Sequence, residues 1–501
     1  MIEPQALPVG SGQLPDQAGR RHQLRRFARR HRAFGLLLLA ATAVRVVVML
    51  GYPGPLLYPD SALYVRAAKP LVPALVNPSG YPIELRLLDF LHTLTAVIVV
   101  QHVMGLAIGV MGYALLRRRF GLPGWGATLA MVPVLLSAYA IQLEHFLLSD
   151  TTFAFLVMLA VVIVMWWSPP PWWACALAGL MLGLAATVRV QGVPLLVVLI
   201  ACLLIGFTGR QTLAGVAVCL VAFAIPVVEY ATWFDSVNGT YNLTTSTGGL
   251  LYGEVSTFAD CNVIKPPPSE RKLCLDVPVS ERMHYAPYYS FRRGVSPIRN
   301  LPGGWAGPKA DSLGLAFALR AIAAQPLDYL RAAGENFAES FALHSGHPGP
   351  YTVGWAGIRE RDYMFPAAHP SYPMPLAASV FRRLDGVFPA QQVVHPWSGW
   401  LQVYQRYVVL SGPLLGLIAL AGLASLVGGW RRIRGPALLP WLTGMALLAT
   451  PAAVLFDPRF VVAAVAPLCV AAAIGIWQIA GRVSAARAGR GEPEGTALET
   501  G

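Results

Sequence analysis

The chain consists largely of apolar runs of about 20 residues, the length that crosses the hydrocarbon core of a bilayer as one helix. Only 13% of its 501 residues are charged. Soluble globular proteins carry about 25% charged residues. The sequence therefore predicts an all-α polytopic membrane protein.

The apolar runs predict about ten membrane-spanning helices. They cover residues 34–52, 91–116, 125–143, 150–167, 172–189, 191–207, 212–233, 402–429, 436–455 and 460–481. An even number of spans places both termini on one side of the membrane. No small-residue cleavage site precedes the first polar loop, so we interpret the first run as a retained anchor rather than a signal peptide.

The predicted spans divide the chain into five parts. We expect a basic, disordered cytoplasmic tail (1–33), a membrane core with spans one to seven (34–233) that includes a first extracytoplasmic loop (53–90), an extracytoplasmic region (234–401), spans eight to ten (402–481) and a cytoplasmic tail (482–501).

The formal net charge of +13 comes mainly from arginines at alternate ends of the apolar runs. Clusters lie within residues 1–33, 117–119, 431–434 and 482–490. Cytoplasmic loops of membrane proteins carry such an excess of arginine and lysine, which here predicts cytoplasmic termini. Because no nucleic-acid-binding motif accompanies the charge, we exclude nucleic-acid binding.

Two features of the 234–401 region suggest an ordered structure. Residues 313–323 have helical periodicity, and Pro326 then stands where a second helix can begin, with Leu327, Leu330 and Phe337 along one face. The cysteines outside the apolar runs are Cys261 and Cys274. A pair of cysteines in an oxidising compartment is predicted to form a disulfide.

Ionisable residues at membrane depth are costly, and they are therefore candidates for function. The sequence has seven in or beside the apolar runs: Arg45, Glu144, Asp150, Arg189, Glu229, Asp457 and Arg459. The predicted topology places all of them near the extracytoplasmic surface, together with Asp60 of the first loop. This convergence predicts a polar site at that surface.

Each acid in this set also has a simpler interpretation. Asp60 is either a catalytic base or the N-cap of a helix over residues 62–75. Asp150 could cap the fourth span, where the helix dipole favours an anion. Glu144 precedes Asp150 by six residues, so the two share a site only if the turn between them is not helical. His145 is interpreted as an interfacial hydrogen-bonding residue.

Arg459 likewise has three interpretations. It could bind a phosphate, extend towards water from the end of a span, or form a local ion pair with Asp457. The aromatic residues of the 234–401 region could stack on sugar rings or form an interfacial belt; they are Trp305, Tyr351, Trp355, Trp397 and Trp400.

Five short stretches resemble motifs of the GT-C glycosyltransferases, membrane enzymes that use polyprenyl-phosphate sugars and include relatives of the protein O-mannosyltransferases and the aminoarabinose transferases. These stretches are Asp60-Ser61-Ala62-Leu63-Tyr64, Pro78-Ser79-Gly80-Tyr81-Pro82, Leu148-Ser149-Asp150-Thr151-Thr152-Phe153, Thr187-Val188-Arg189 and Asp457-Pro458-Arg459-Phe460. The resemblance covers residues 34–233 and 402–481. It departs from the family where Ser61 replaces the second of two adjacent acids.

The resemblance implies an inverting transfer of a sugar to an extracytoplasmic acceptor, which is a glycan, lipid or protein of the cell envelope. A composition rich in Arg, Ala, Gly and Pro suggests a bacterial source. The resemblance also implies Asp60 as the base and Asp150 or Glu144 as a second acid. Arg66, Lys69, Arg189 and Arg459 are implied to bind the donor phosphate, and Tyr64, Tyr81 and His145 to shape the substrate site. Because a divalent ion needs several oxygen ligands and Ser61 removes one acid, no metal or other cofactor is expected.

A transporter or flippase of lipid-linked sugars is the alternative function. Such a protein needs polar groups along a path near the bilayer midplane. In this sequence the ionisable residues are predicted to lie at one surface, which favours the enzyme.

Overall fold

The computed structural model describes residues 17–342, 365, 392–427 and 438–488. These residues form helices and connecting turns, with two isolated β-bridges and no strand among them. The α-helices are α1 (Gln17–Gly51), α2 (Pro59–Ala68), α3 (Gly80–Leu88), α4 (Leu94–Arg118), α5 (Gly124–Leu136), α6 (Ala138–His145), α7 (Asp150–Met165), α8 (Trp172–Val188), α9 (Gly192–Gly206), α10 (Arg210–Asn238), α11 (Thr247–Val255), α12 (Cys261–Ile264), α13 (Ala286–Phe291), α14 (Pro308–Ala324), α15 (Pro326–Glu339), α17 (Trp397–Tyr407), α18 (Gly412–Val427), α19 (Leu438–Val454) and α20 (Val462–Ala488).

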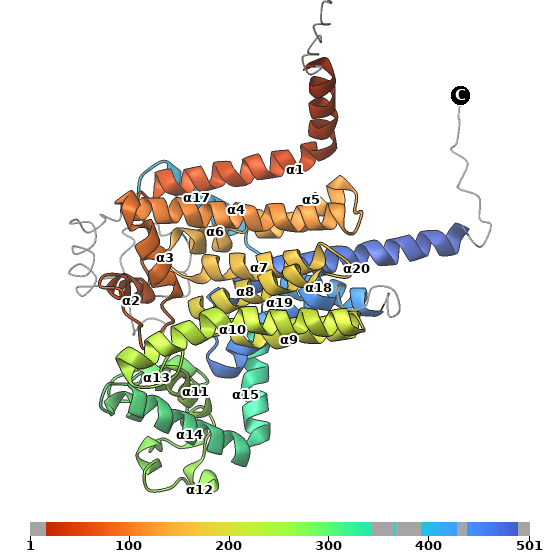
Figure 1. Cartoon of the computed structure of the whole chain (residues 1–501). Helices are drawn as coiled ribbons and strands as arrows, with labels where there is room; N and C mark the ends of the chain where they lie inside the picture. Colours follow the sequence, from red (N-terminus) through yellow and green to blue (C-terminus); the bar gives the residue numbers. More distant parts are fainter. Residues whose placement is uncertain (1–16, 343–364, 366–391, 428–437, 489–501) are drawn as a thin grey trace, which may run out of the picture.

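The long apolar helices run side by side in a bundle (Figure 1). Helices α2 and α3 lie at one end of this bundle, and the C-terminal end of α20 lies at the other. Within the described residues, helices long and apolar enough to cross a membrane are Arg29–Gly51, Leu94–Arg118, Arg210–Asn238 and Pro458–Gly481. The chain is a multi-pass membrane protein.

Each of the ten predicted runs overlaps a helix or a bent helix pair. This overlap does not show that each run crosses the membrane. Counting two bent pairs as single spans gives up to 6 crossings among the described residues. The remaining apolar helices, α7, α8, α9 and α19, have 10–17 residues and are shorter than an ordinary span. The predicted number of ten spans stays a prediction.

The two bent pairs break opposite each other. Helices α5 and α6 meet at 50°, and α17 and α18 meet at 55°. At the breaks the Ala138 N–H donates to the Val408 carbonyl at 2.8 Å, and the Tyr404 hydroxyl donates to the Leu136 carbonyl. Each break therefore provides a hydrogen-bond donor for a backbone carbonyl that the other break leaves without its helical partner. An apolar environment requires such pairing of backbone groups.

The structure differs from two local expectations. Helix α1 begins at Gln17, so helix rather than disorder covers residues 17–33. Helix α2 ends at Ala68 instead of residue 75. It ends there because Pro70 has no backbone N–H and disfavours helical geometry at Lys69.

The part of the chain between α10 and α17 contains a second hydrophobic core, centred on Tyr252, Phe317 and Ala321. Helices α14 and α15 form the predicted helical hairpin, with Pro326 at the start of α15. Cys261 and Cys274 form a disulfide with a Cα–Cα distance of 6.1 Å.

The apolar face predicted for α15 is only partly packed. Phe337 packs against the core of the bundle. Leu327 and Leu330, in contrast, are 78% and 64% exposed. The three residues share one helix, as predicted, but only Phe337 is packed.

Helix α15 is fixed to the end of α19 by two side chains. The Tyr329 hydroxyl donates to the Ala453 carbonyl at 2.9 Å, and the Asn336 amide donates to the Ala452 carbonyl at 3.1 Å. The same amide donates to Oε1 of Glu254 at 2.8 Å. Burial raises the pKa of Glu254 to about 8, so its carboxyl is mainly protonated at neutral pH.

This buried carboxyl predicts a loss of stability as pH rises. Its pKa in the folded state lies above the value of about 4.3 for an unfolded chain, so the folded state binds more protons between these values and stability falls across that window. We expect Glu254→Gln to unfold at a higher temperature than wild type at pH 8.5 and to show a smaller decrease between pH 5 and 8.5. The measurement is thermal unfolding of the full chain in detergent.

Glu281→Gln is the matched control, since Glu281 is exposed and should leave the pH dependence unchanged. An identical pH dependence in Glu254→Gln and wild type would show that Glu254 is already ionised in the folded protein.

Candidate functional site

An ion pair connects the first loop to the last apolar helix. Oδ2 of Asp60 lies 2.8 Å from Nη2 of Arg459. Asp60 stands in the first turn of α2, whose N-cap is Tyr58, and the Ser61 hydroxyl accepts the Tyr58 N–H at 2.9 Å. Asp60 is therefore not the helix cap, and its carboxylate is directed to Arg459.

Arg459 is held on several sides. It belongs to a 3-10 turn, Pro458–Val461, in which the Asp457 carboxylate accepts the Arg459 N–H at 3.0 Å. Asp457 also lies 3.4 Å from Nε of Arg459, so the local ion pair is present as well. The guanidinium lies over the rings of Tyr58 and Phe460, with centroid distances of 4.6 and 5.0 Å. Only 11% of the side chain is exposed, so Arg459 does not extend towards water.

A second ion pair lies beside the first. Oδ1 of Asp150 is 2.6 Å from Nη1 of Arg189. Asp150 is the first residue of α7, and Arg189 directly follows α8. The Arg189 guanidinium lies 4.6 Å from the centroid of Phe460. Phe460 thus contacts both arginines and brings the two ion pairs into one cluster.

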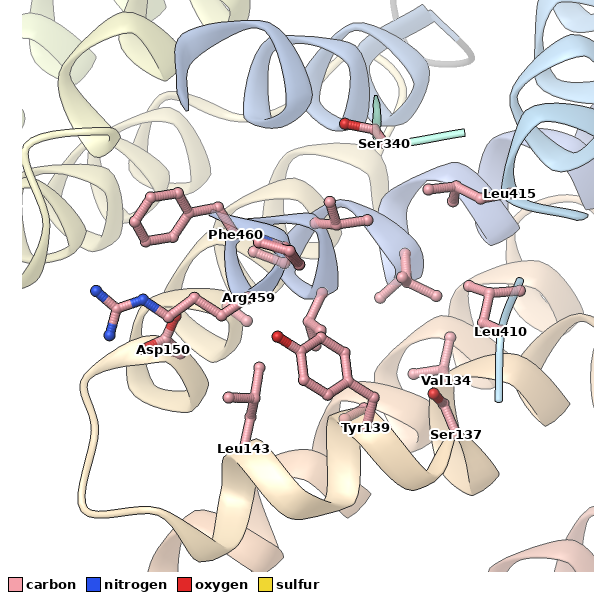
Figure 2. Close-up of a pocket in the computed structure, with 18 of the residues that line it drawn as sticks. Val134, Ser137, Tyr139, Leu143, Asp150, Ser340, Leu410, Leu415, Arg459 and Phe460 are labelled. Carbon is pink, nitrogen blue, oxygen red and sulfur yellow. The ribbon is translucent and has the colours of Figure 1, made fainter. Parts of the chain in front are cut away.

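The cluster borders a cavity of ≈ 320 Å³. Asp150, Arg189 and Arg459 line it together with many apolar side chains. Figure 2 shows Asp150 and Arg459 on one side of the cavity, and Val134, Leu410 and Leu415 on the other. The cavity therefore has the two ion pairs on one side and mainly apolar side chains on the other, and Glu144 and Glu339 also belong to its lining.

The side with the two ion pairs has unused hydrogen-bonding capacity. Nε and Nη1 of Arg459 and Oδ2 of Asp150 are buried without a hydrogen-bond partner among the described residues. Asp60 does not line the cavity; it is connected to it through Arg459, and 17% of its side chain is exposed. The two guanidinium groups can still bind an anion from the cavity side.

Glu144 lines the same cavity but belongs to a different network. Arg45 donates to both of its carboxylate oxygens at 2.7 and 2.6 Å, and His102 lies 2.8 Å away. Residues 146–149 between α6 and α7 are not helical, which is the condition under which Glu144 and Asp150 can share a site. Glu144 is nevertheless fully engaged by its own partners.

Three other polar candidates lie away from the cluster. Arg66 is exposed, and Lys69 forms an exposed ion pair with Asp89 at 3.5 Å. Glu229 is exposed on α10. The structure thus brings Asp60, Asp150, Arg189, Asp457 and Arg459 together, but not all of the predicted set. A role of Arg66 and Lys69 in phosphate binding stays a prediction.

The residues predicted to shape the substrate site are buried outside the cavity lining. The Tyr64 hydroxyl is 2.8 Å from the Ser149 hydroxyl, and the Tyr81 hydroxyl donates to Gln101 at 2.5 Å. The two rings pack edge to face with centroids 5.0 Å apart. Burial raises the pKa of the Tyr64 hydroxyl above its ordinary value. Neither tyrosine, nor His145, lines the cavity.

Sequence reasoning missed three residues of this region. Tyr58 donates a hydrogen bond to Oδ2 of Asp457 at 3.3 Å in addition to its contact with Arg459. Phe460 lies between the arginines. Glu84 accepts a hydrogen bond from Thr152 at 2.7 Å, and burial raises its pKa to about 7. The only available signal was the position of Phe460 at the end of the Asp457–Phe460 motif and that of Tyr58 two residues before Asp60.

Of the aromatic candidates, Trp305, Trp397 and Trp400 do not line the cavity. Trp305 packs against Phe291, and Trp397 against Trp400, with centroids 4.8 and 5.3 Å apart. Tyr351 and Trp355 lie outside the described residues. Among the residues described, no group of three or more His, Cys, Asp or Glu side chains could hold a metal ion. Metal independence stays a prediction.

No protein-family model and no curated protein sequence matches the chain. Among solved structures, the oligosaccharyltransferase AglB from Archaeoglobus fulgidus, in complex with an inhibitory peptide and a dolichol-phosphate, has a TM-score of 0.43 and 12% identity, and the match covers 93% of this chain and 52% of that one. ArnT from Cupriavidus metallidurans, bound to undecaprenyl phosphate, has a TM-score of 0.35 and 12% identity, covering 90% of this chain and 78% of that one.

Both structural neighbours are GT-C glycosyltransferases, the class that the sequence motifs resemble. The chain spans about half the length of the archaeal protein. With TM-scores below 0.5, this likeness assigns no activity to the chain, so its function has to be argued from the site.

Proposed function

We propose that this protein is an inverting glycosyltransferase that moves a sugar from a polyprenyl-phosphate donor to an acceptor on the extracytoplasmic side of a bacterial plasma membrane. The observation that supports it most is the cavity with mainly apolar side chains on one side and two enclosed arginines on the other. A lipid phosphate has the same division into an apolar chain and an anionic group.

The two arginines suit a phosphate. A planar guanidinium presents paired donors that match phosphate oxygens, and such charge-assisted hydrogen bonds are stronger than neutral ones. Nη1 and Nε of Arg459 have no hydrogen-bond partner among the residues described, so a phosphate can bind Arg459 without displacing Asp60. As the glycosidic bond breaks, both arginines stabilise the negative charge on the leaving phosphate.

Asp60 is placed to act as the base. Its carboxylate contacts Arg459 and keeps some exposure to solvent, whereas Arg459 itself lines the cavity. The acceptor hydroxyl therefore approaches on the Asp60 side and the donor phosphate on the cavity side. Asp60 accepts the hydroxyl proton while the oxygen attacks the anomeric carbon. A single displacement of this kind inverts the sugar configuration.

The charge at the site changes when one phosphodiester binds. Asp60, Asp150 and Asp457 accompany only two arginines, so a bound anion increases the negative charge. Burial raises the pKa of Asp457, although Arg459 opposes this effect. Uptake of a proton by Asp457 can therefore compensate for the single negative charge of a polyprenyl-phosphate sugar.

The two broken helix pairs beside the cavity favour a second candidate function, a transporter or flippase of lipid-linked sugars. Discontinuous helices form the substrate sites of many transporters. Here, however, each break hydrogen-bonds to the other, through the Val408 and Leu136 carbonyls, and the two ion pairs lie on one side of the cavity. A transporter would move the donor intact, whereas the proposed enzyme releases polyprenyl phosphate.

Replacing Arg189 tests phosphate binding. We expect Arg189→Gln to weaken binding of undecaprenyl phosphate by about ten- to a hundred-fold, since hydrogen bonds to a charged group contribute roughly 1.5–3 kcal/mol. Binding to the purified protein in detergent can be measured by native mass spectrometry over a range of lipid concentrations.

Arg331→Gln is the matched control, because Arg331 has a 79% exposed side chain on α15. Equal affinities of Arg189→Gln and Arg331→Gln would contradict the assignment of the cavity to a lipid phosphate. A parallel measurement on Arg66→Gln decides whether the exposed cation predicted from the sequence takes part.

A further inference from the structure

A chain of hydrogen bonds connects Glu144 to the backbone at the end of α1. Nδ1 of His102 lies 2.8 Å from Oε2 of Glu144, Nε2 of His102 lies 3.1 Å from Nδ1 of His145, and Nε2 of His145 lies 2.9 Å from the carbonyl oxygen of Tyr52. Both histidines are buried, with 4% and 0% of their surface exposed. The proposed reaction uses neither of them.

Both ends of this chain can only accept hydrogen bonds. The Tyr52 group is a backbone carbonyl, and Glu144 is a carboxylate because Arg45 donates to both of its oxygens. Three hydrogen bonds therefore need three protons on the four ring nitrogens of His102 and His145. Two neutral imidazoles supply only two protons. The geometry requires one additional proton, or else two lone pairs face each other across the 3.1 Å contact.

The surrounding charges decide which ring is cationic. Glu144 of α6 lies against His102, and Arg45 of α1 lies on the other side of Glu144. Two tyrosines are further titratable groups on the helices around the histidines. Tyr81 of α3 donates a hydrogen bond to Gln101 of α4. Tyr404 of α17 donates its hydroxyl to a backbone carbonyl of α5. Of the two rings, only His102 contacts the carboxylate directly. The imidazolium therefore belongs to His102, with His145 as the neutral tautomer that donates from Nε2.

This pair lies where the two acid-bearing segments meet. The His145 carbonyl accepts the Leu56 N–H, and the Leu147 N–H donates to the Leu56 carbonyl, each at 3.0 Å. The Ser61 hydroxyl donates to the Leu147 carbonyl at 2.9 Å. Asp60 follows one of these segments and Asp150 follows the other.

We propose that His102 and His145 share one additional proton and act as positioning residues that hold the Asp60 and Asp150 segments in register. Loss of the proton removes one of the three hydrogen bonds, so the segments separate more easily. The folded arrangement binds this proton and is stabilised while the proton is present. Positioning therefore weakens as pH rises and the pair is deprotonated. That the two histidines share an additional proton does not depend on the proposed function. The effect of this proton on sugar transfer does rest on the proposed function.

Nitrogen NMR of the full chain in lipid bilayers, with ¹⁵N-labelled histidine, tests the proton count. At pH 7 we expect one imidazolium ring and a through-hydrogen-bond ¹⁵N–¹⁵N coupling between His102 and His145. Both signals should be absent from His102→Gln and His145→Gln and present in His284→Gln, a variant of a side chain that is 77% exposed. Two neutral rings without coupling in the wild-type protein would overturn the proposal, even if neither variant folds.

The pH dependence of transfer tests the positioning role. In wild type, kcat should fall on the alkaline side as the pair is deprotonated, while KM for the donor changes little. His102→Gln should remove this alkaline decrease and lower kcat at neutral pH by roughly ten-fold, the effect of about 1.4 kcal/mol. An unchanged alkaline decrease in His102→Gln would overturn the positioning role. Absence of sugar transfer in the wild-type protein would instead contradict the proposed function. The NMR result would then still decide whether the histidine pair carries an additional proton.

Discussion

Asp60→Asn should abolish sugar transfer while the protein still inserts and binds donor. The substitution keeps the shape of the side chain but removes the carboxylate that accepts the proton of the acceptor hydroxyl. General-base catalysis contributes about 10²- to 10⁴-fold, so kcat should fall by at least about 100-fold. Donor affinity should be retained or increased, because the negative charge 2.8 Å from Arg459 is removed. Transfer in membranes and lipid binding on purified protein are measured side by side.

Asp276→Asn is the control for this variant. Asp276 is exposed and lies in the region between α10 and α17, away from the cavity, so transfer should be unchanged. Activity of Asp60→Asn within a few-fold of wild type would reject Asp60 as the base.

Arg459→Lys should greatly reduce donor use although it keeps the positive charge. A lysine ammonium cannot reproduce the planar set of donors with which Arg459 contacts Asp60 and a phosphate, nor its stacking over Tyr58 and Phe460. Losing hydrogen bonds to a charged group costs roughly 1.5–3 kcal/mol, which corresponds to about ten- to over a hundred-fold in kcat/KM for the donor. Transfer rates at varied donor concentration provide this value.

Arg320→Lys is the matched control on α14, where Arg320 pairs with Glu270 at 3.1 Å. It should change donor use little. If Arg459→Lys behaves like Arg320→Lys, the phosphate does not bind at Arg459 and has to be sought at Arg189, Arg66 or Lys69.

The helical class and the grouping of ionisable residues at the loop motifs could be predicted from the sequence. Apolar runs of about 20 residues indicate helices that can cross a bilayer, and a proline before Arg459 or Asp60 marks where a helix begins. Asp150 and Arg189 are predicted only to lie near the same surface, because both stand at the ends of apolar runs. The structure supports this reasoning with a 2.6 Å contact.

The partners of these residues could not be predicted, because they depend on tertiary packing. Asp60 and Arg459 are 399 positions apart, and no local pattern connects them. The contacts of Arg45 and His102 with the Glu144 carboxylate have no signal in the sequence, and a role of Glu144 as a second acid stays a prediction. The cavity itself depends on helix breaks opposite each other, which bring Ser137 and Leu410 to the same space. The helical periodicity of the sequence does not indicate that two helix breaks lie opposite each other.

A cryo-electron microscopy structure of the protein with undecaprenyl phosphate tests the central claim most directly. We expect phosphate oxygens within hydrogen-bond distance of Arg189 and Arg459, and the prenyl chain along the apolar side of the cavity formed by Val134, Leu410 and Leu415. Asp60 should face the side of the phosphate that the acceptor approaches. A phosphate bound at Arg66 and Lys69, or a lipid bound outside the cavity with both ion pairs unchanged, would contradict the account.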